Sequence, residues 1–162
     1  FMREQITELI YKSFLTLDDL NFSGYIDLCH SSFNYKIGAY SPEIRKQMTW
    51  LEESRDSLKL LFENLPKHNS DHSRLSRLGN VYLINQESNG DWSTLTFLQV
   101  FRTTLDGGAS ELFAVGKIKD KIREEGGTLK LLDRDIQLET RMFGFGHLPK
   151  RQRIHRRQSH RR

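Results

Sequence analysis

Cysteine is nearly absent from this sequence, and long apolar runs are absent altogether. The only cysteine is Cys29, so neither an internal disulfide nor a cysteine-rich metal site can form within the chain. No apolar run approaches the ~20 residues that cross a bilayer, and we expect no membrane span. The first residues also lack the basic-then-apolar pattern of a signal peptide. These absences predict a protein of the reducing cytoplasm.

Acidic residues are missing from the C-terminal segment 147–162. Its basic residues are Lys150, Arg151, Arg153, Arg156, Arg157, Arg161 and Arg162. Without these seven charges the formal net charge of +4 becomes −3, so the remaining chain is mildly acidic. Clustered arginines can neutralise phosphate, but no aromatic residues are interleaved with them, which argues against nucleic-acid binding. We predict one domain over 1–146, followed by a basic tail that is a solvated extension or a subunit-docking strap.

Helical periodicity is confined to the first 65 residues. Apolar residues recur three and four positions apart from Ile6 to Leu17 and again from Phe22 to Cys29, which predicts two consecutive amphipathic helices. Asp18 or Asp19 is placed to cap the second of them. A third helix is predicted from Leu58 to Leu65.

The second half of the chain is rich in β-branched and aromatic residues and is interrupted by glycine-containing turns. A short strand is expected at 33–40 and extended structure at 48–51, and four long strands are expected at 75–85, 92–105, 112–123 and 129–142. The long strands form an antiparallel meander. Helices followed by a meander predict an α+β fold, in which the helices pack on the concave face of one curved sheet.

Two charged residues of the last hairpin point where apolar residues point. Asp120 alternates with the apolar residues of its strand, and Arg134 does the same on the next strand. A loop centred on Gly127 pairs Asp120 with Arg134, Ile122 with Leu132, and Ile118 with Ile136. Either charge buried alone would cost several kcal/mol, so we interpret the two residues as a structural ion pair rather than a catalytic site.

Four segments in this order resemble the small (β) subunit of aromatic-ring-hydroxylating dioxygenases, which are Rieske non-haem iron oxygenases. They lie at 17–28, 77–81, 113–123 and 131–138. In that family the third segment is similar to Phe113-Ala114-Val115-Gly116 followed by basic residues and Asp120, and the fourth to Arg134 followed by alternating apolar residues. The order and spacing of the four segments carry the resemblance, and no single segment does. Within the family, 40–46 and 48–51 are most similar to the small hydroxylase subunit of methanesulfonate monooxygenase. The resemblance covers about Ile6 to Met142.

The resemblance implies the nuclear-transport-factor-2-like (NTF2-like, cystatin-like) cone fold and a non-catalytic, structural role. It implies a large (α) subunit partner that carries the Rieske cluster and a mononuclear iron, with three copies of each subunit in the complex. A Rieske cluster needs two cysteine and two histidine ligands, which a chain with one cysteine cannot supply. We therefore expect no cofactor in this chain.

Few residues suggest chemistry of the chain's own. His68, Asp71 and His72 form the best local metal set, but a short polar loop is the simpler interpretation. His30 is interpreted as a residue at the end of the second helix. The cone fold also hosts isomerases of the ketosteroid-isomerase type and dehydratases of the scytalone-dehydratase type. A dehydratase-like site could recruit Asp27, Tyr25, Tyr35 and His72.

Large apolar residues lie on both faces of the expected sheet, because Leu95, Phe97 and Phe101 alternate with Leu98 and Val100. The helices can cover one face only, so we expect the other to be buried against neighbouring subunits. The resemblance implies that these form a closed ring of three copies, a homotrimer. Phe97 and Phe101 are interface candidates, and Arg102 is expected to bridge an acid across that interface. Three functions remain open at this point: an oxygenase small subunit, a stand-alone lyase or isomerase, and a homo-oligomeric ligand-binding module.

Overall fold

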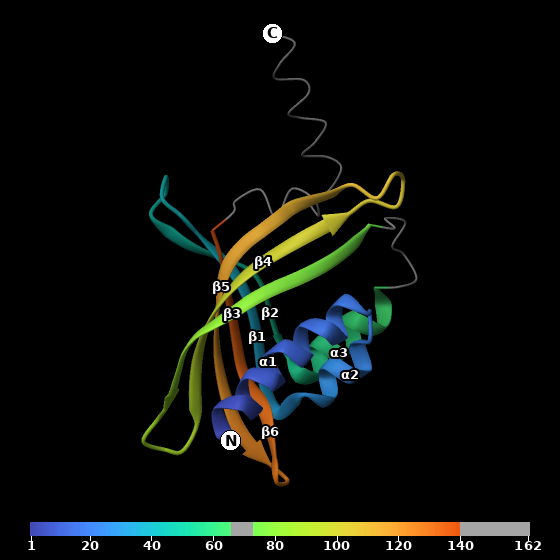
Figure 1. The fold of residues 1–162 in the computed structure, drawn as a ribbon. Helices are drawn as coiled ribbons and strands as arrows, with labels where there is room; N and C mark the ends of the chain where they lie inside the picture. Colours follow the sequence, from blue (N-terminus) through green and yellow to red (C-terminus); the bar gives the residue numbers. More distant parts are fainter. Residues whose placement is uncertain (66–72, 140–162) are drawn as a thin grey trace.

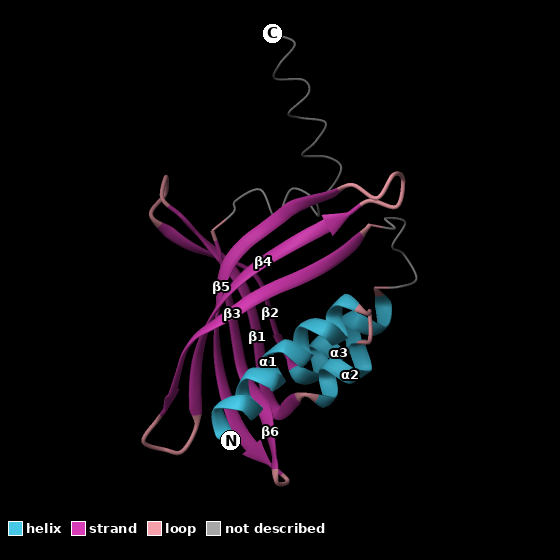
Figure 2. Ribbon diagram, viewed as in Figure 1, coloured by secondary structure: helices cyan, strands magenta, loops and turns pink. Residues whose placement is uncertain are grey.

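The computed structural model describes residues 1–65 and 73–139, and these form one strongly curved sheet with three helices on one of its faces (Figures 1 and 2). The order along the chain is α1, α2, β1, β2, α3, and then β3 to β6. This is the α+β arrangement expected from the sequence. The predicted tail 147–162 lies outside the described residues.

The sheet has six strands in the order β2-β1-β6-β5-β4-β3. Their bounds are β1 Cys29–Ser41, β2 Lys46–Ser54, β3 Arg74–Gln86, β4 Trp92–Thr103, β5 Ser110–Glu125 and β6 Thr128–Leu138. Strands β3 to β6 form the expected antiparallel meander. The periodicity did not predict that β1 pairs with β6 in parallel, which joins the β1–β2 hairpin to the meander.

The helices are α1 Met2–Asp18, α2 Phe22–Asp27 and α3 Arg55–Asn64. The expectation that Asp18 or Asp19 caps the second helix is wrong, because Asn21 caps α2 by accepting a hydrogen bond from the Gly24 amide. Leu20 has a φ of 57° and turns the chain first, so α2 begins later than predicted. None of the described helices is long and apolar enough to span a membrane.

The last hairpin has the predicted register in its middle but not near its turn. Asp120 faces Arg134, as expected, whereas Ile122 pairs with Leu131 and not with Leu132. Gly126 and Gly127 both have positive φ and form a two-residue turn, which shifts the pairing by one residue. An irregularity between Lys121 and Ile122 then restores the predicted register.

A second irregularity changes which face Leu112 occupies. The register shifts between Val100 and Phe101, so that Val100 faces Ala114 but Phe101 faces Leu112. Leu112 was expected to point inward with Ala114, yet it is exposed. An extra residue in one strand reverses the alternation beyond it, and that is why a strict period of two failed here.

The core lies between the helices and the covered face of the sheet, which we call the inner face. Side chains of α1 pack against β3 and β6, and α3 packs against β1. Buried core residues include Ile6, Ile10 and Phe14 from α1 and Ile118, Ile122 and Ile136 from the sheet. None of the three described helices lies over the opposite face, which we call the outer face (Figure 1).

Two glycines allow strands to approach closely where the sheet bends. A Cβ atom on Gly116 would lie 2.5 Å from the carbonyl oxygen of Gln137, and one on Gly38 would lie 2.5 Å from that of Met48. Both neighbours are backbone atoms, which cannot move aside without breaking strand pairing. Glycine is therefore required at these positions by the packing of neighbouring strands.

We expect Gly116→Ala to lower the free energy of unfolding by about 1–3 kcal/mol, because the added methyl group collides with the backbone of β6. Urea denaturation measures this loss. The exposed neighbour Lys117 offers a control, since Lys117→Ala should change stability by less than about 1 kcal/mol. Equal stability of Gly116→Ala and the wild type would contradict the close approach.

Candidate functional site

The structure brings Asp120 and Arg134 together at the centre of the inner face. The Arg134 side chain donates from Nε to Asp120 Oδ1 at 2.9 Å and from a terminal nitrogen to Oδ2 at 3.0 Å. Its other terminal nitrogen donates to Ser13 Oγ at 2.8 Å and lies 3.4 Å from Tyr25 OH. Asp120 and Arg134 are only 1% and 2% exposed. One buried guanidinium therefore connects β5, β6, α1 and α2.

Electrostatics keep the buried Arg134 guanidinium charged. Burial by itself would lower the pKa of Arg134, but the attraction and hydrogen bonding of Asp120, together with contributions from Tyr25 and Tyr35, raise the pKa above its ordinary value. Burial also raises the pKa of Tyr25, so its hydroxyl stays protonated. The guanidinium also lies over the ring of Phe14, with its carbon 5.7 Å from the ring centroid. The bidentate geometry fits a structural anchor that leaves neither charge available to a substrate.

The residues considered for a dehydratase-like site do not gather around an open cavity. Tyr25 and Tyr35 are buried in the core, while Asp27 is exposed at the last position of α2. The strand that follows α2, β1, contains no acidic residue that could act as an isomerase-type base. His72 lies outside the described residues.

The metal candidates His68, Asp71 and His72 also fall outside the described residues. His30 is not at a helix end as expected, because α2 ends at Asp27 and His30 belongs to β1. Its Nε2 lies 3.3 Å from Glu125 Oε2. Across 1–65 and 73–139 no group of three or more histidine, cysteine, aspartate or glutamate side chains could hold a metal ion.

The outer face carries an apolar band on the strands β3, β4 and β5. Its members are Leu78, Tyr82, Leu83, Leu95, Phe97, Phe101 and Leu112. The rings of Tyr82 and Phe97 stack with their centroids 6.1 Å apart. Leu78, Tyr82, Leu83 and Leu112 are each more than half exposed. A contiguous exposed apolar surface on a sheet indicates an interaction site.

The interface candidates occupy this band or its edge. Phe97 and Phe101 are half-buried members of the band, as their alternation with buried Leu98 and Val100 predicted. Arg102 binds Glu111 of its own chain, and its guanidinium carbon lies 5.2 Å from the ring centroid of Phe113. The intersubunit acid expected for Arg102 stays a prediction, and Glu111 is its partner within the chain.

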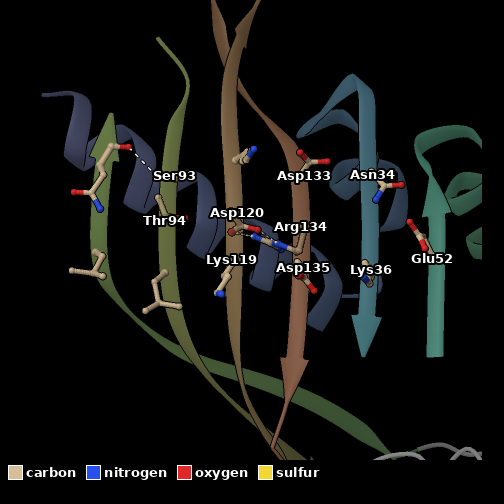
Figure 3. A pocket seen from close by; sticks show the side chains of 14 residues that line it. Asn34, Lys36, Glu52, Ser93, Thr94, Lys119, Asp120, Asp133, Arg134 and Asp135 are labelled. Atoms are coloured by element: carbon tan, nitrogen blue, oxygen red, sulfur yellow. Dashed lines mark hydrogen bonds and ion pairs between the residues drawn. The ribbon is translucent and has the colours of Figure 1, made fainter. Parts of the chain in front are cut away.

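Next to the band, the outer face is hollowed into a groove of about 620 Å³ that crosses all six strands (Figure 3). We call it the outer groove. Leu83 and Leu95 line its apolar end, and charged side chains from the other strands line the rest: Lys36, Glu52, Lys119, Lys121, Asp133 and Asp135.

The outer groove was not predicted from the sequence, although its signal was present. Lys119 and Lys121 alternate on β5, and Asp133 and Asp135 alternate on β6. Pairing Asp120 with Arg134 necessarily places Lys121 opposite Asp133 and Lys119 opposite Asp135. The register places these charged residues on one face of the sheet. Whether they line a hollow depends on the twist of the sheet, which the register does not specify.

No family model matches the sequence, whereas curated relatives match along most of it. The chain is 36% identical over 155 residues to the methanesulfonate monooxygenase hydroxylase β subunit of Methylosulfonomonas methylovora, which covers 90% of this chain and 86% of the relative. It is 24% identical to the 2-aminobenzenesulfonate 2,3-dioxygenase β subunit of an Alcaligenes species, over 89% of this chain and 96% of the relative.

Solved structures agree on the fold. A β subunit assigned to an aromatic-ring-hydroxylating dioxygenase of Novosphingobium aromaticivorans superposes with a TM-score of 0.74 at 21% identity, covering 85% of this chain and 88% of that one. A ketosteroid isomerase-like protein of Erwinia carotovora atroseptica superposes with a TM-score of 0.59 at 9% identity, covering 85% and 95%. The chain thus has the NTF2-like cone fold, which both proteins share.

This fold has a paired Asp120 and Arg134 on its inner face and an exposed apolar band on its outer face. The chain belongs to the family of β (small) subunits of Rieske-type ring-hydroxylating oxygenases. Within that family it is similar to the β subunit of a methanesulfonate monooxygenase hydroxylase. The comparisons do not favour the stand-alone dehydratase or isomerase.

Asp120→Asn should lower the free energy of unfolding by roughly 3 kcal/mol, because it leaves the Arg134 charge buried without its counterion. Chemical denaturation measures this loss, and substrate preference of the assembled oxygenase should not change. Asp135→Asn, on the outer face of the neighbouring strand, is the control and should cost less than about 1 kcal/mol. An altered substrate preference with unchanged stability would refute the structural interpretation of the pair.

A second ion pair, at the β3–β4 turn, makes stability depend on acid. Hydrogen bonds from Arg123, 2.8 and 2.7 Å long, lower the pKa of Asp91 below its ordinary value. Stability from a lowered carboxyl pKa is complete above the unfolded pKa of about 3.9 and is lost as the pH falls through the folded pKa. The free energy of unfolding should be measured from pH 6 down to pH 2, about two units on either side of that unfolded pKa. We expect it to fall less with acid in Asp91→Asn than in the wild type. An unchanged pH profile relative to the exposed control Asp106→Asn would contradict this role.

Proposed function

We propose that this chain is the non-catalytic small subunit of a multicomponent oxygenase and that it supports assembly of a large subunit containing the iron centres. The observation that carries the proposal is the contrast between the two faces of the sheet. The inner face is closed by helices around a satisfied ion pair, while the outer face exposes the apolar band. A subunit that acts through assembly needs an exposed apolar surface such as the band. It does not need an open cavity on the inner face.

The redox chemistry is assigned to the partner because of the ligands available here. A Rieske cluster requires two cysteine and two histidine ligands, and this sequence has one cysteine. That residue, Cys29, is buried in the core, where burial raises the pKa of its thiol to about 12. A protonated and buried thiol is a poor metal ligand. The same free thiol fits the reducing cytoplasm proposed as the compartment of the complex.

A homotrimer of this chain, within a complex of three large and three small subunits, is the proposed arrangement. A ring of three copies would bury the same apolar surface on each copy. Because the ring is closed, the apolar band would be covered on all three copies. The exposed leucines and Tyr82 of the band suit an interface rather than a solvent-exposed surface. Phe97 and Phe101 would lie in that interface, with Arg102 at its edge.

We further assign a sulfonate as the substrate class of the complex. Both curated relatives carry sulfonated compounds in their names, one of them aliphatic and the other aromatic. The feature common to the two compounds is the sulfonate group, while the carbon skeletons differ. In this arrangement the substrate pocket belongs to the large subunit, so the small subunit would not discriminate between aliphatic and aromatic substrates.

Co-expression with an oxygenase large (α) subunit tests the proposal. Native mass spectrometry of the purified complex should give equal numbers of the two subunits, three of each, and metal analysis should find iron only when the large subunit is present. Phe97→Asp should weaken assembly at least tenfold, about 1.4 kcal/mol, because it buries a charge in the band.

The control for this experiment is Leu15→Asp, which changes an exposed leucine on α1, away from the band. It should leave assembly unchanged. A wild-type chain that sediments as a stable, folded monomer and binds no large subunit would refute the scaffold function. Iron bound stoichiometrically by the small subunit alone would refute the assignment of the redox centres.

A further inference from the structure

The β1–β2 hairpin extends past the rest of the sheet as an arm, which comprises residues 40–48. Pairing between β1 and β6 ends at Ala39 and Leu138, whereas pairing between β1 and β2 continues to Ser41 and Lys46. Among residues 1–65 and 73–139, the tip of this hairpin therefore has a neighbouring strand on neither side. In Figure 1 it projects from the body on the side away from the helices.

The arm exposes large apolar side chains that its own chain does not cover. Tyr40, Ile44 and Met48 are 53%, 58% and 43% exposed, although they lie within nine residues of one another. Apolar side chains on a projecting hairpin have no core to join in the isolated chain. Tyr40 and Met48 lie on opposite faces of the hairpin, because Met48 pairs with Ala39 and Tyr40 pairs with Gln47. Large apolar side chains exposed on both faces of a projecting hairpin indicate that it packs against another surface.

The turn of the arm also retains a side chain where glycine would be easier to accommodate. Arg45 has a φ of 51°, a region that costs a non-glycine residue energy. The other hairpin turns use glycine at positive φ, at Gly90, at Gly107 and Gly108, and at Gly126 and Gly127. The arm instead presents the Arg45 guanidinium beside Lys46 at its tip. This places two cations next to the exposed Ile44.

The outer groove offers the complementary features. Its apolar end contains Leu83 and Leu95, and three acidic residues line it besides Asp120, which is paired with Arg134: Glu52, Asp133 and Asp135. None of these three carboxylates forms an ion pair within 4.0 Å with another described residue, although lysines are interleaved with them. A cation brought in by another chain would therefore find carboxylates that are not already paired.

We propose that the arm of one copy inserts into the outer groove of the next copy, with Ile44 on Leu83 and Leu95 and Arg45 on Asp133 or Asp135. This inference rests on the proposed homotrimer and names the surfaces that build it. A closed ring of three requires two different complementary surfaces on every copy. The arm and the apolar end of the groove meet this requirement, because they lie at opposite edges of the sheet. The arm belongs to β2 and β1, and the apolar end belongs to β4 and β3.

Arg45→Gly separates docking from folding. It relieves the positive φ, so unfolding stability should stay equal or rise, while the loss of the guanidinium should weaken self-association about fivefold or more, as expected for one charge-assisted contact. Ile44→Asp should weaken self-association at least tenfold, on the order of one lost apolar anchor. Leu60→Asp, an equally exposed leucine on α3, is the matched control and should associate like the wild type. Sedimentation of the chain, alone and in the co-expressed complex, measures these changes.

A disulfide trap identifies the groove as the receiving surface. Ile44→Cys combined with Leu83→Cys should give a covalently linked trimer on oxidation, whereas Ile44→Cys combined with Leu60→Cys should give none. Cys29 does not interfere, because it is buried.

Several outcomes overturn the inference in distinguishable ways. A wild-type trimer that is unaffected by Arg45→Gly and Ile44→Asp, and that gives no linked trimer, refutes arm docking while the proposed function stands. A disulfide formed within one chain shows that the arm covers its own groove and also refutes it. A wild-type assembly that contains a single small subunit refutes the trimer and the docking together.

Discussion

The buried pair of Asp120 and Arg134 is the interaction on which the rest of the fold depends. Arg134 connects Asp120 on β5 with Ser13 on α1 and Tyr25 on α2, so a single guanidinium sets how the helices sit on the sheet. A buried ion pair is not in itself a large source of stability, because desolvation offsets much of its attraction. Its value here lies in specificity, since a helix displaced along the inner face would leave the charge without partners.

The same pair explains why this cone is closed where enzymes with the same fold keep a reaction site. The two charged groups inside, Asp120 and Arg134, bind each other and are almost completely buried. The open surface of the molecule is the outer face, with the apolar band and the outer groove. The division of labour proposed for the oxygenase follows from this geometry, with chemistry in the large subunit and assembly through the outer face of the small one.

Prediction from sequence succeeded where local rules and tertiary contacts agreed. The inward positions of Asp120 and Arg134 followed from alternation along two strands, and their pairing followed from the position of the glycine turn. It failed where the chain inserts an extra residue. The irregularity beside Lys121 separates the predicted pairing of Asp120 from the shifted pairing of Ile122, and the irregularity beside Phe101 turns Leu112 to the outer face. A bulge reverses alternation without leaving a mark in the hydrophobic pattern.

By itself the sequence determined the α+β class, the inward ion pair and the absence of a cysteine set for a Rieske cluster, because these follow from periodicity, parity and ligand counting. Only the tertiary structure decided that β1 lies parallel to β6, that the β1–β2 hairpin projects as an arm, and that charged residues of six strands surround one groove. The physical reason is that these features arise from contacts between segments far apart in the chain. Their geometry depends on sheet twist and strand ends, and no local pattern encodes either of these.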